Sequence, residues 1–277
     1  MKLIKMSGTG NDFLIADLRS PEGQRAWQEL AQDLPPSQVA AQLCHRQFGI
    51  GSDGLILVKP GCQDIDFIWD FYNSDGSSAE MCGNAARCVS RWFAEQSGPL
   101  TEDQHPLCFQ TQAGLIRAQV HPRGFVSVEM SPLKVHEAQG QMESHGQTIN
   151  YSYVDSGVPH IVLQTEGTFD FQKMKPVAEY LRNHPHFGEE GANVTFVRET
   201  SPEAVHSVSF ERGVEDFTLA CGTGAVAAAW AHRQQHPGPQ PIQVQLPGGQ
   251  VTVSFQGPQP ILYGPAHYIA EIYPLKP

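Results

Sequence analysis

The chain carries two matching stretches, Phe71-Tyr-Asn-Ser-Asp-Gly-Ser-Ser-Ala-Glu-Met-Cys-Gly-Asn-Ala-Ala-Arg-Cys88 and Phe210-Glu-Arg-Gly-Val-Glu-Asp-Phe-Thr-Leu-Ala-Cys-Gly-Thr-Gly-Ala-Val-Ala-Ala-Ala229. In each, a β-type run leads through a polar turn to a Cys-Gly pair and then to a helix of small residues. The helix after Cys221 is small and apolar on all sides, which is typical of a helix buried in the middle of a domain. The two stretches therefore predict two domains, each built around a central helix.

The match extends beyond the Cys-Gly pairs. At the offset of 139 residues that separates the two cysteines, several further positions coincide. A glycine turn also recurs, as Ser7–Asn11 and Ser156–His160, with Asn11 falling on His160. Two Ala/Gly-rich helices could resemble each other by chance, but the common order of the features favours duplication. The coincident pairs are Phe71 and Phe210, Asn73 and Arg212, Gly83 and Gly222, Asn84 and Thr223, and Ala85 and Gly224.

Short runs rich in Val, Ile, Phe and Tyr, bounded by Gly, Pro, Asn or Ser, outnumber helical patterns along the chain, which indicates an α+β protein. We expect helices at 22–32, 37–47, 84–95, 171–183 and 224–233. We expect strands at 3–6, 13–17, 55–58, 65–72, 115–120, 125–130, 151–155, 161–164, 193–198, 205–210, 242–246, 251–255 and 268–273.

The composition narrows the class of protein. The 277 residues allow about two domains. A formal net charge of −11 argues against binding to nucleic acid or anionic lipid. The most apolar run, Gly224–Ala231, is too short to span a membrane, and the N-terminus lacks the core of a signal peptide. We therefore expect a cytoplasmic protein with no membrane or nucleic-acid partner.

The number and spacing of the cysteines indicate free thiols, not disulfides or metal ligands. Six cysteines are too few for a disulfide scaffold of this size, and none forms a CxxC pair or has zinc-finger spacing, so we expect no structural metal. Cys82 and Cys221 differ from the rest because each opens a helix, where unpaired N–H groups and the helix dipole stabilise a thiolate and lower its pKa. The small residues that follow, Gly83, Gly222 and Gly224, let a ligand approach the backbone.

Two such helix starts suit one reaction. A thiolate removes the α-proton from one face of an amino acid, and a thiol on the other face returns a proton. Configuration inverts with no pyridoxal cofactor, while the helix N-termini bind the substrate carboxylate and stabilise the enolate-like charge. One cysteine must be ionised and the other protonated, so the pair titrates as a unit. A lone Cys-Gly pair would indicate a buried structural cysteine, but two matched copies favour catalysis.

These motifs resemble the diaminopimelate epimerase family. The resemblance rests on Asn73–Ser77, on Glu80–Cys88, and on Glu211-Arg-Gly followed by Leu219–Ala225. The segments Lys5–Phe13 and Leu246–Gly249 also match. It covers nearly the whole chain in the right order. It implies two pseudo-symmetric domains, each a mixed β-sheet or barrel wrapped around a central helix, with the active site in the cleft between them.

The resemblance implies a first domain at residues 1–118, completed by the C-terminal strand in 266–277, and a second at 119–265. It also assigns roles to residues in this sequence. Cys82 and Cys221 match the proton-transfer thiols, and Arg212 is the natural partner for the distal substrate carboxylate. The other implied substrate contacts are Gly83 and Asn84, Gly222 and Thr223, Asn11, Asn73, Asn193 and Glu211, with His160 as a supporting polar group near the reacting centre.

Each polar residue also has a structural interpretation. Asn11 and Asn73 could be turn residues bonded to their own backbone. Glu211 and Arg212 could form an exposed pair at a strand end, and His160 could be a core histidine. The sequence also departs from the family in two places. It has Gly54 where some members carry a glutamine, and Val158 where many carry an asparagine, which leaves the choice of substrate open.

The leading hypothesis is epimerisation of LL-diaminopimelate to the meso form, on the route to lysine and peptidoglycan, with a small amino-acid substrate, no cofactor and no metal. A relative with the same machinery acting on proline or histidine is the nearest alternative. A third is a non-catalytic binding or redox protein whose thiols form a reversible disulfide. The family resemblance also suggests a homodimer.

Overall fold

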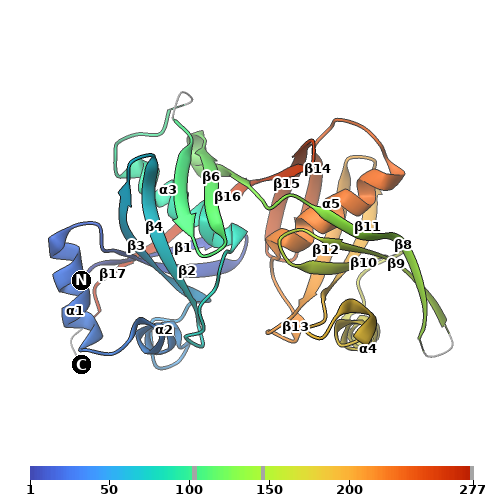
Figure 1. Ribbon diagram of the computed structural model, residues 1–277, viewed down its shortest axis with the longest axis horizontal. Coiled ribbons are helices and arrows are strands. Elements are labelled where there is room, and N and C mark those ends of the chain that lie inside the picture. Colours follow the sequence, from blue (N-terminus) through green and yellow to red (C-terminus); the bar gives the residue numbers. More distant parts are fainter. Residues whose placement is uncertain (102–104, 145–146, 275–277) are drawn as a thin grey trace. The chain divides into compact units, whose positions relative to one another are not determined.

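A computed structural model describes residues 1–101, 105–144 and 147–274. The chain forms two compact units, residues 1–128 with 264–277 (unit 1) and residues 129–263 (unit 2) (Figure 1). The sequence placed the boundaries at 118/119 and 265/266. The first boundary in the structure lies ten residues later because the strand that begins at Phe125 pairs with the strand 114–120 of unit 1. Residues 275–277 of the expected C-terminal segment lie outside the described residues.

Unit 1 is a mixed sheet in the strand order β17-β1-β2-β3-β4-β5-β6-β7. The pairs β2–β3 and β4–β5 are parallel, and the others are antiparallel. The strands are β1 (Leu3–Gly8), β2 (Asn11–Asp17), β3 (Gly54–Cys62), β4 (Ile65–Asn73), β5 (Leu107–Thr111), β6 (Gly114–Val120), β7 (Phe125–Glu129) and β17 (His267–Ile272). The helices are α1 (Pro21–Ala31), α2 (Pro36–Cys44) and α3 (Gly83–Glu95).

Unit 2 has the order β8-β9-β10-β11-β12-β14-β15-β16. Here β10–β11 and β12–β14 are the parallel pairs. The strands are β8 (Lys134–Ser144), β9 (Gln147–Asp155), β10 (Pro159–Gln164), β11 (Asn193–Ser201), β12 (Ala204–Glu211), β13 (Asp216–Phe217), β14 (Ile242–Leu246), β15 (Gly249–Gln256) and β16 (Gln259–Pro265). The helices are α4 (Phe171–Arg182) and α5 (Gly222–Gln235).

The two sheets have the same architecture. Each runs through eight strands with parallel pairs at the third and fifth junctions. The N-terminal strands of the two repeats, β1 and β9, occupy the same place in this order. This agreement confirms the duplication inferred from the two Cys-Gly motifs, as well as the predicted α+β class with two pseudo-symmetric domains.

A central helix packs against each sheet. Helix α3 contacts β1 and β2 near one end of its sheet and β6 near the other, so the sheet curves around it. Helix α5 contacts β10, β11, β12, β14 and β15 in the same manner. The residues of α5 from Gly224 to Ala229 are all buried, because side chains this small let the strands approach from every side. Within the described ranges, no helix is both long and apolar enough to cross a membrane.

Candidate active site

Both predicted thiols occupy the N-cap of a central helix. Cys82 precedes α3 with extended backbone (φ −145°, ψ 121°) and is half-buried. Cys221 precedes α5 with φ −114° and ψ 112° and is only 5% exposed. An extended N-cap turns its side chain toward the first N–H groups of the helix, and the Gly224 N–H donates to Cys221 Sγ at 3.3 Å. Cys221 therefore caps its own helix.

The glycine in the first turn of α5 is needed for packing. A Cβ on Gly224 would lie 2.2 Å from Ser209 Oγ, on the neighbouring β12. The sequence suggested that this glycine leaves room for a ligand. In the structure, Ser209 occupies that room and brings the strand against the helix beneath Cys221.

A hydrogen-bonded network connects Cys221 to the strands of unit 2. Thr223 Oγ1 lies 3.4 Å from Cys221 Sγ and 2.9 Å from His160 Nε2. Nδ2 of Asn193 also approaches His160 Nε2, at 3.3 Å, while His160 Nδ1 lies 2.8 Å from Thr195 Oγ1. His160 is fully buried, and this burial lowers its pKa to about 3. The imidazole is therefore neutral, and it holds Thr223 in place.

The orientation of Asn193 fixes the tautomer of His160. The backbone N–H of Arg212 donates to Asn193 Oδ1 at 2.7 Å, so the Nδ2 donor of this amide faces the imidazole. His160 Nε2 must then be the acceptor, and Nδ1 carries the proton that is donated to Thr195. The resemblance gave His160 a supporting role, and these contacts are consistent with it.

The electrostatics around Cys221 differ from the expectation. Burial raises the pKa of the Cys221 thiol well above its usual value, and the neighbouring Glu211 carboxylate raises it further. The hydrogen bonds from Thr223 and Gly224 lower it by less. The expected low thiol pKa at a helix start is therefore not met at Cys221, because in the unliganded protein desolvation outweighs the helix terminus. Cys221 rests as a protonated thiol.

Glu211 shares a hydrogen bond with Cys221 and accepts another from the Thr218 hydroxyl. The residue as a whole is partly exposed, but its carboxyl group is enclosed, and this burial raises its pKa despite the two hydrogen bonds. The structure thus places the Glu211 carboxyl group beside the Cys221 thiol. The alternative prediction, an exposed pair of Glu211 with Arg212 at a strand end, is wrong for Glu211.

The Arg212 side chain is partly exposed to solvent. Its Nη1 lies 2.8 Å from Glu190 Oε2, and the two side chains are 33% and 83% exposed. An exposed ion pair of this kind contributes about 0–1 kcal/mol, so a substrate carboxylate can replace Glu190 at small cost. Arg212 is therefore available for an anionic ligand while its backbone orients Asn193.

The corresponding network of unit 1 is built from amides. Asn84 Nδ2 donates to Asn11 Oδ1 at 2.7 Å, and Asn11 Nδ2 donates to Asp53 Oδ2 at 2.9 Å. Asn84 Oδ1 accepts from Arg87 Nη2 at 2.9 Å. Asn11 therefore bonds to other elements of the unit rather than to its own turn.

Sequence reasoning missed Arg87. Its side chain is fully buried and also donates to the Thr9 hydroxyl and to the Pro265 carbonyl. Thr9 has φ 57°, an unusual backbone conformation for a β-branched residue, and the buried guanidinium contacts it directly. Within the described ranges, no carboxylate forms an ion pair with Arg87. The nearby groups able to carry negative charge are the thiols of Cys82 and Cys88.

Cys88 is not available as that anion. Burial raises the pKa of its thiol to about 12. Cys82 is then the thiol whose ionised form the buried Arg87 would favour. The signal in the sequence is an arginine three residues beyond Asn84, on a helix that is otherwise built of small residues at this end.

A charged cluster supports Asn11 from outside. Arg46 donates to both carboxylate oxygens of Asp12, at 2.9 and 2.7 Å, and to Asp53 Oδ1 at 2.7 Å. Burial acts to raise the pKa of Asp12, but hydrogen bonds from Arg46 and Lys5 outweigh it, so the pKa is lowered. The sequence-based predictions give these residues no role, although Lys5 and Asp12 lie in the motif segment 5–13.

The remaining predicted positions lie in turns or tight packing. Asn73 bonds to Ser77 within its own turn, through its amide and its backbone N–H, as the structural interpretation anticipated. Gly54 lies opposite Asn73 in the β3–β4 register. A Cβ there would be 2.4 Å from the Phe71 ring, so no longer side chain fits without movement. Val158 is partly exposed, and its carbonyl accepts a hydrogen bond in the turn before β10.

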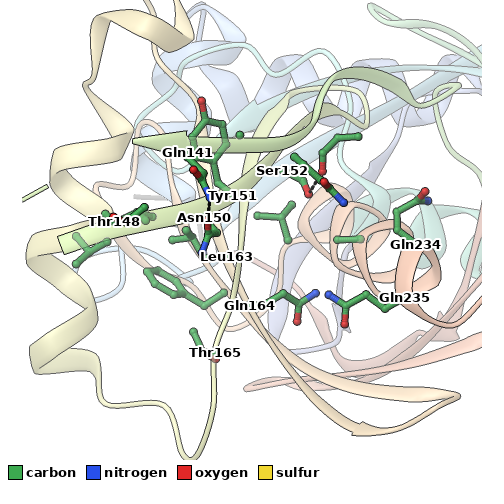
Figure 2. A pocket seen from close by; sticks show the side chains of 18 residues that line it. Gln141, Thr148, Asn150, Tyr151, Ser152, Leu163, Gln164, Thr165, Gln234 and Gln235 are labelled. Atoms are coloured by element: carbon green, nitrogen blue, oxygen red, sulfur yellow. Dashed lines mark hydrogen bonds between the residues drawn. The ribbon is translucent and has the colours of Figure 1, made fainter. Parts of the chain in front are cut away.

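A cavity of about 850 Å³ in unit 2 lies elsewhere, and none of the predicted site residues lines it. Figure 2 shows that its polar lining is largely of amides, with Gln164 and Gln235 pointing toward one another. No thiol, carboxyl group or imidazole is among its lining residues in the described chain. It therefore lacks the thiols on which the predicted proton transfer depends.

A family model and curated relatives match most of the chain. The family described as diaminopimelate epimerase matches residues 3–135 and 152–269. The diaminopimelate epimerase of Aquifex aeolicus is 37% identical over 83% of this chain and 80% of its own length. That of Carboxydothermus hydrogenoformans is 35% identical over 97% of both chains. A solved hydroxyproline epimerase from Agrobacterium vitis has the same fold, with a TM-score of 0.73 and 19% identity over 98% of this chain and 91% of that one.

Proposed function

The chain belongs to the diaminopimelate epimerase family, and we propose that it inverts one α-carbon of LL-diaminopimelate to give the meso isomer without a pyridoxal cofactor. The observation that carries this proposal is the presence of a cysteine at the N-cap of both central helices, Cys82 on α3 and Cys221 on α5. The relatives at 35–37% identity carry the diaminopimelate name, which favours this substrate over proline or histidine.

The reaction needs one thiolate and one thiol. The thiolate takes the α-proton and becomes a thiol, and the other thiol delivers its proton to the opposite face and becomes a thiolate. Protons balance, and the pair ends in the reverse protonation state. Because Cys221 rests protonated, it is the donor in the first turnover, and Cys82 is the base. Arg87 supplies the buried positive charge that favours the Cys82 thiolate.

The helix N-termini bind the reacting carboxylate. Backbone N–H groups at Gly83 and Asn84, and at Gly222 and Thr223, donate to its oxygens and stabilise the negative charge that develops when the α-proton leaves. Glu211 contacts the α-amino group, which is cationic and lowers the cost of the buried carboxylate.

The far end of the substrate is an amino acid that does not react. Its carboxylate displaces Glu190 from Arg212, which forms a charge-assisted pair with it. Asn193 and Asn11 provide uncharged hydrogen-bonding groups, and Asn73 does so once its amide leaves Ser77. Val158 offers an apolar contact where the family often has an amide.

The test is solvent exchange in deuterium oxide. Reduced protein without pyridoxal phosphate should incorporate deuterium at one α-carbon of LL-diaminopimelate and produce the meso isomer. Cys82→Ala and Cys221→Ala should each abolish epimerisation, while Cys62→Ala, at an exposed cysteine, should retain it. Full activity in either N-cap variant would disprove the two-thiol mechanism. Exchange on proline or histidine, but not on diaminopimelate, would disprove the substrate.

We also propose that the enzyme works in the cytoplasm, since both thiols must stay reduced for proton transfer. The family resemblance suggests a homodimer. Light scattering of the purified chain, with a mass of 30.4 kDa per copy, distinguishes a dimer from a monomer.

A further inference from the structure

Three side chains meet at the far end of helix α5. His232 lies in the last turn of the helix and His236 is its C-cap residue, with ring centroids 4.6 Å apart, and Glu199 projects from β11. One potential metal-binding atom from each of the three residues lies within 4.8 Å of the other two. His236 Nε2 is 2.8 Å from Glu199 Oε2, and His232 Nδ1 is 3.9 Å from the same oxygen.

A buried, unpaired nitrogen points into this cluster. His232 is fully buried, and its Nε2 lies 3.1 Å from the Pro202 carbonyl oxygen. A carbonyl only accepts, so Nε2 carries the proton and Nδ1 carries a lone pair. Within the described residues, Nδ1 of His232 has no hydrogen-bond partner. A lone pair therefore faces the Glu199 carboxylate across a separation too long for a hydrogen bond.

The neighbouring Arg233 is engaged elsewhere. The side chain of Arg233, on the same turn of α5, stacks over Phe255 at 5.1 Å from the ring centroid and donates to the Gln240 carbonyl. His236 bonds to the carboxylate oxygen but leaves His232 Nδ1 unsatisfied. The lone pair on His232 Nδ1, the Glu199 carboxylate and the His236 imidazole thus converge on one point.

We propose that Glu199, His232 and His236 form a binding site for one divalent transition-metal ion of the zinc type. Zinc-type ions bind readily to two imidazoles and a carboxylate. Magnesium and calcium instead prefer a set made only of oxygen ligands. The Pro202 carbonyl fixes the tautomer of His232, as a hydrogen bond to the second ring nitrogen commonly does in metal sites. Glu199 and His236 are 41% and 31% exposed, which leaves a path for the ion and a position for water.

The site is structural rather than catalytic. His232 is ten residues beyond Gly222, about 15 Å along the helix from the Cys221 end. A metal there ties α5 to β11 and stabilises unit 2. This inference does not depend on the proposed epimerase activity. The spacing of the cysteines predicts no structural metal, and the histidines by themselves are typical of packing or surface positions. The signal was the pair His232 and His236, four residues apart at and just beyond the end of the helix predicted at 224–233.

The experiment titrates chelator-treated, tag-free protein with Co²⁺ and then displaces it with Zn²⁺. We expect one equivalent to bind, visible d–d bands without a sulfur-to-metal charge-transfer band, and a rise in the melting temperature on Zn²⁺ addition. Glu199→Gln and His236→Gln, at partly exposed positions, should each weaken binding at least tenfold. His232→Ala should do the same, but its burial makes misfolding a separate outcome, so the two other variants decide the test.

The matched control is His186→Gln. His186 Nε2 pairs with Glu137 Oε1 at 2.5 Å, which gives a histidine–glutamate pair without the third side chain of the proposed site. This variant should bind Co²⁺ with unchanged affinity. The proposal is overturned if no metal binds at millimolar concentration, if the cobalt spectrum shows thiolate ligation, or if Glu199→Gln and His236→Gln bind as tightly as the parent protein.

Discussion

Thr223 contacts His160, with Oγ1 and Nε2 2.9 Å apart, and the sequence-equivalent residues of unit 1 make the same contact, because Asn84 donates to Asn11 at 2.7 Å. Each contact joins the second residue after an N-cap cysteine to the strand that follows a glycine turn. The contact between helix and strand is thus present in both units, although its groups differ. Two amides form it in unit 1, and a hydroxyl and an imidazole form it in unit 2. The position of each thiol therefore depends on a side-chain pair outside the Cys-Gly motif.

The buried imidazole of His160 predicts a pH dependence of stability. Burial holds the His160 pKa at about 3 in the folded protein, against roughly 6.5 when unfolded. As the pH falls below about 6.5, the unfolded chain takes up a proton that the folded chain rejects, so stability is lost at up to ~1.4 kcal/mol per pH unit. His160→Gln should remove this contribution and flatten the slope between pH 6.5 and 5. Urea unfolding at several pH values measures it.

His267→Gln, at an exposed position in β17, is the control and should leave the slope unchanged. Equal slopes for the parent and His160→Gln would mean that His160 is accessible to protons in the folded protein.

Replacing Glu211 should change the reactivity of the Cys221 thiol. After burial, its carboxylate is the main cause of the raised Cys221 pKa. Glu211→Gln removes that negative charge and should lower the thiol pKa by about one unit. Alkylation of Cys221 by iodoacetamide, followed by peptide mass spectrometry across a pH series, reports the midpoint. If the midpoint stays unchanged, Glu211 is already protonated in the resting protein.

Replacing Arg87 should change the reactivity of the Cys82 thiol. Arg87→Met removes the buried positive charge near Cys82 and should slow alkylation of Cys82 about tenfold at neutral pH, which corresponds to roughly 1.4 kcal/mol of lost charge stabilisation. Arg87→Lys keeps the charge and should recover most of the rate. If Met and Lys variants react equally slowly, Arg87 acts through its hydrogen bonds to Thr9 and Asn84 rather than through its charge.

Gly54 predicts a packing defect. A Cβ at this position would lie 2.4 Å from the Phe71 ring and 2.7 Å from the Tyr72 carbonyl oxygen, and backbone cannot move aside easily. Gly54→Ala should lower the free energy of unfolding by about 1–3 kcal/mol. Gly238→Ala, where no atom would lie within 4 Å of the new Cβ, is the matched control. Chemical denaturation of both variants gives the comparison, and equal losses would show that β3 yields to the extra methyl group.

The sequence predicted the α-helices of the described chain to within three residues at each end, and the largest error is at α2, which has no side-chain cap and ends at Cys44 instead of residue 47. Ser20 and Asp170 cap α1 and α4 through their side chains, and small residues mark α3 and α5. Among the missed strands, β13 has only two residues, β5 and β16 follow the usual alternation of buried and partly exposed residues, and the described side chains of β8 do not alternate in this way. Strand β8 is polar and contains Gly140, and β16 contains Pro260, a residue that normally ends strands. Only pairing with neighbouring strands makes these segments β-structure, which is a property of the whole sheet.

The site was predictable where a motif fixes position, and less so where burial fixes chemistry. Both cysteines lie at helix starts, as their spacing before glycine indicated. The raised pKa of Cys221 could not be foreseen, because it depends on how completely the folded chain buries the thiol and on the proximity of Glu211. Likewise, nothing local shows that Arg87 is buried without a carboxylate partner. Those properties come from contacts between distant segments.

The pairing of β17 with β1 determines when each unit can be completed during synthesis. Unit 2 is one continuous segment, so all its residues have been synthesised once residue 263 is made. The edge strand β1 of unit 1 must wait for residues 267–272. Until then, Leu3 and its neighbours present unpaired backbone groups, a surface prone to pairing with other chains. The first unit to be translated is therefore the last that can finish folding, and nascent chains stalled before β17 should aggregate more readily than complete ones.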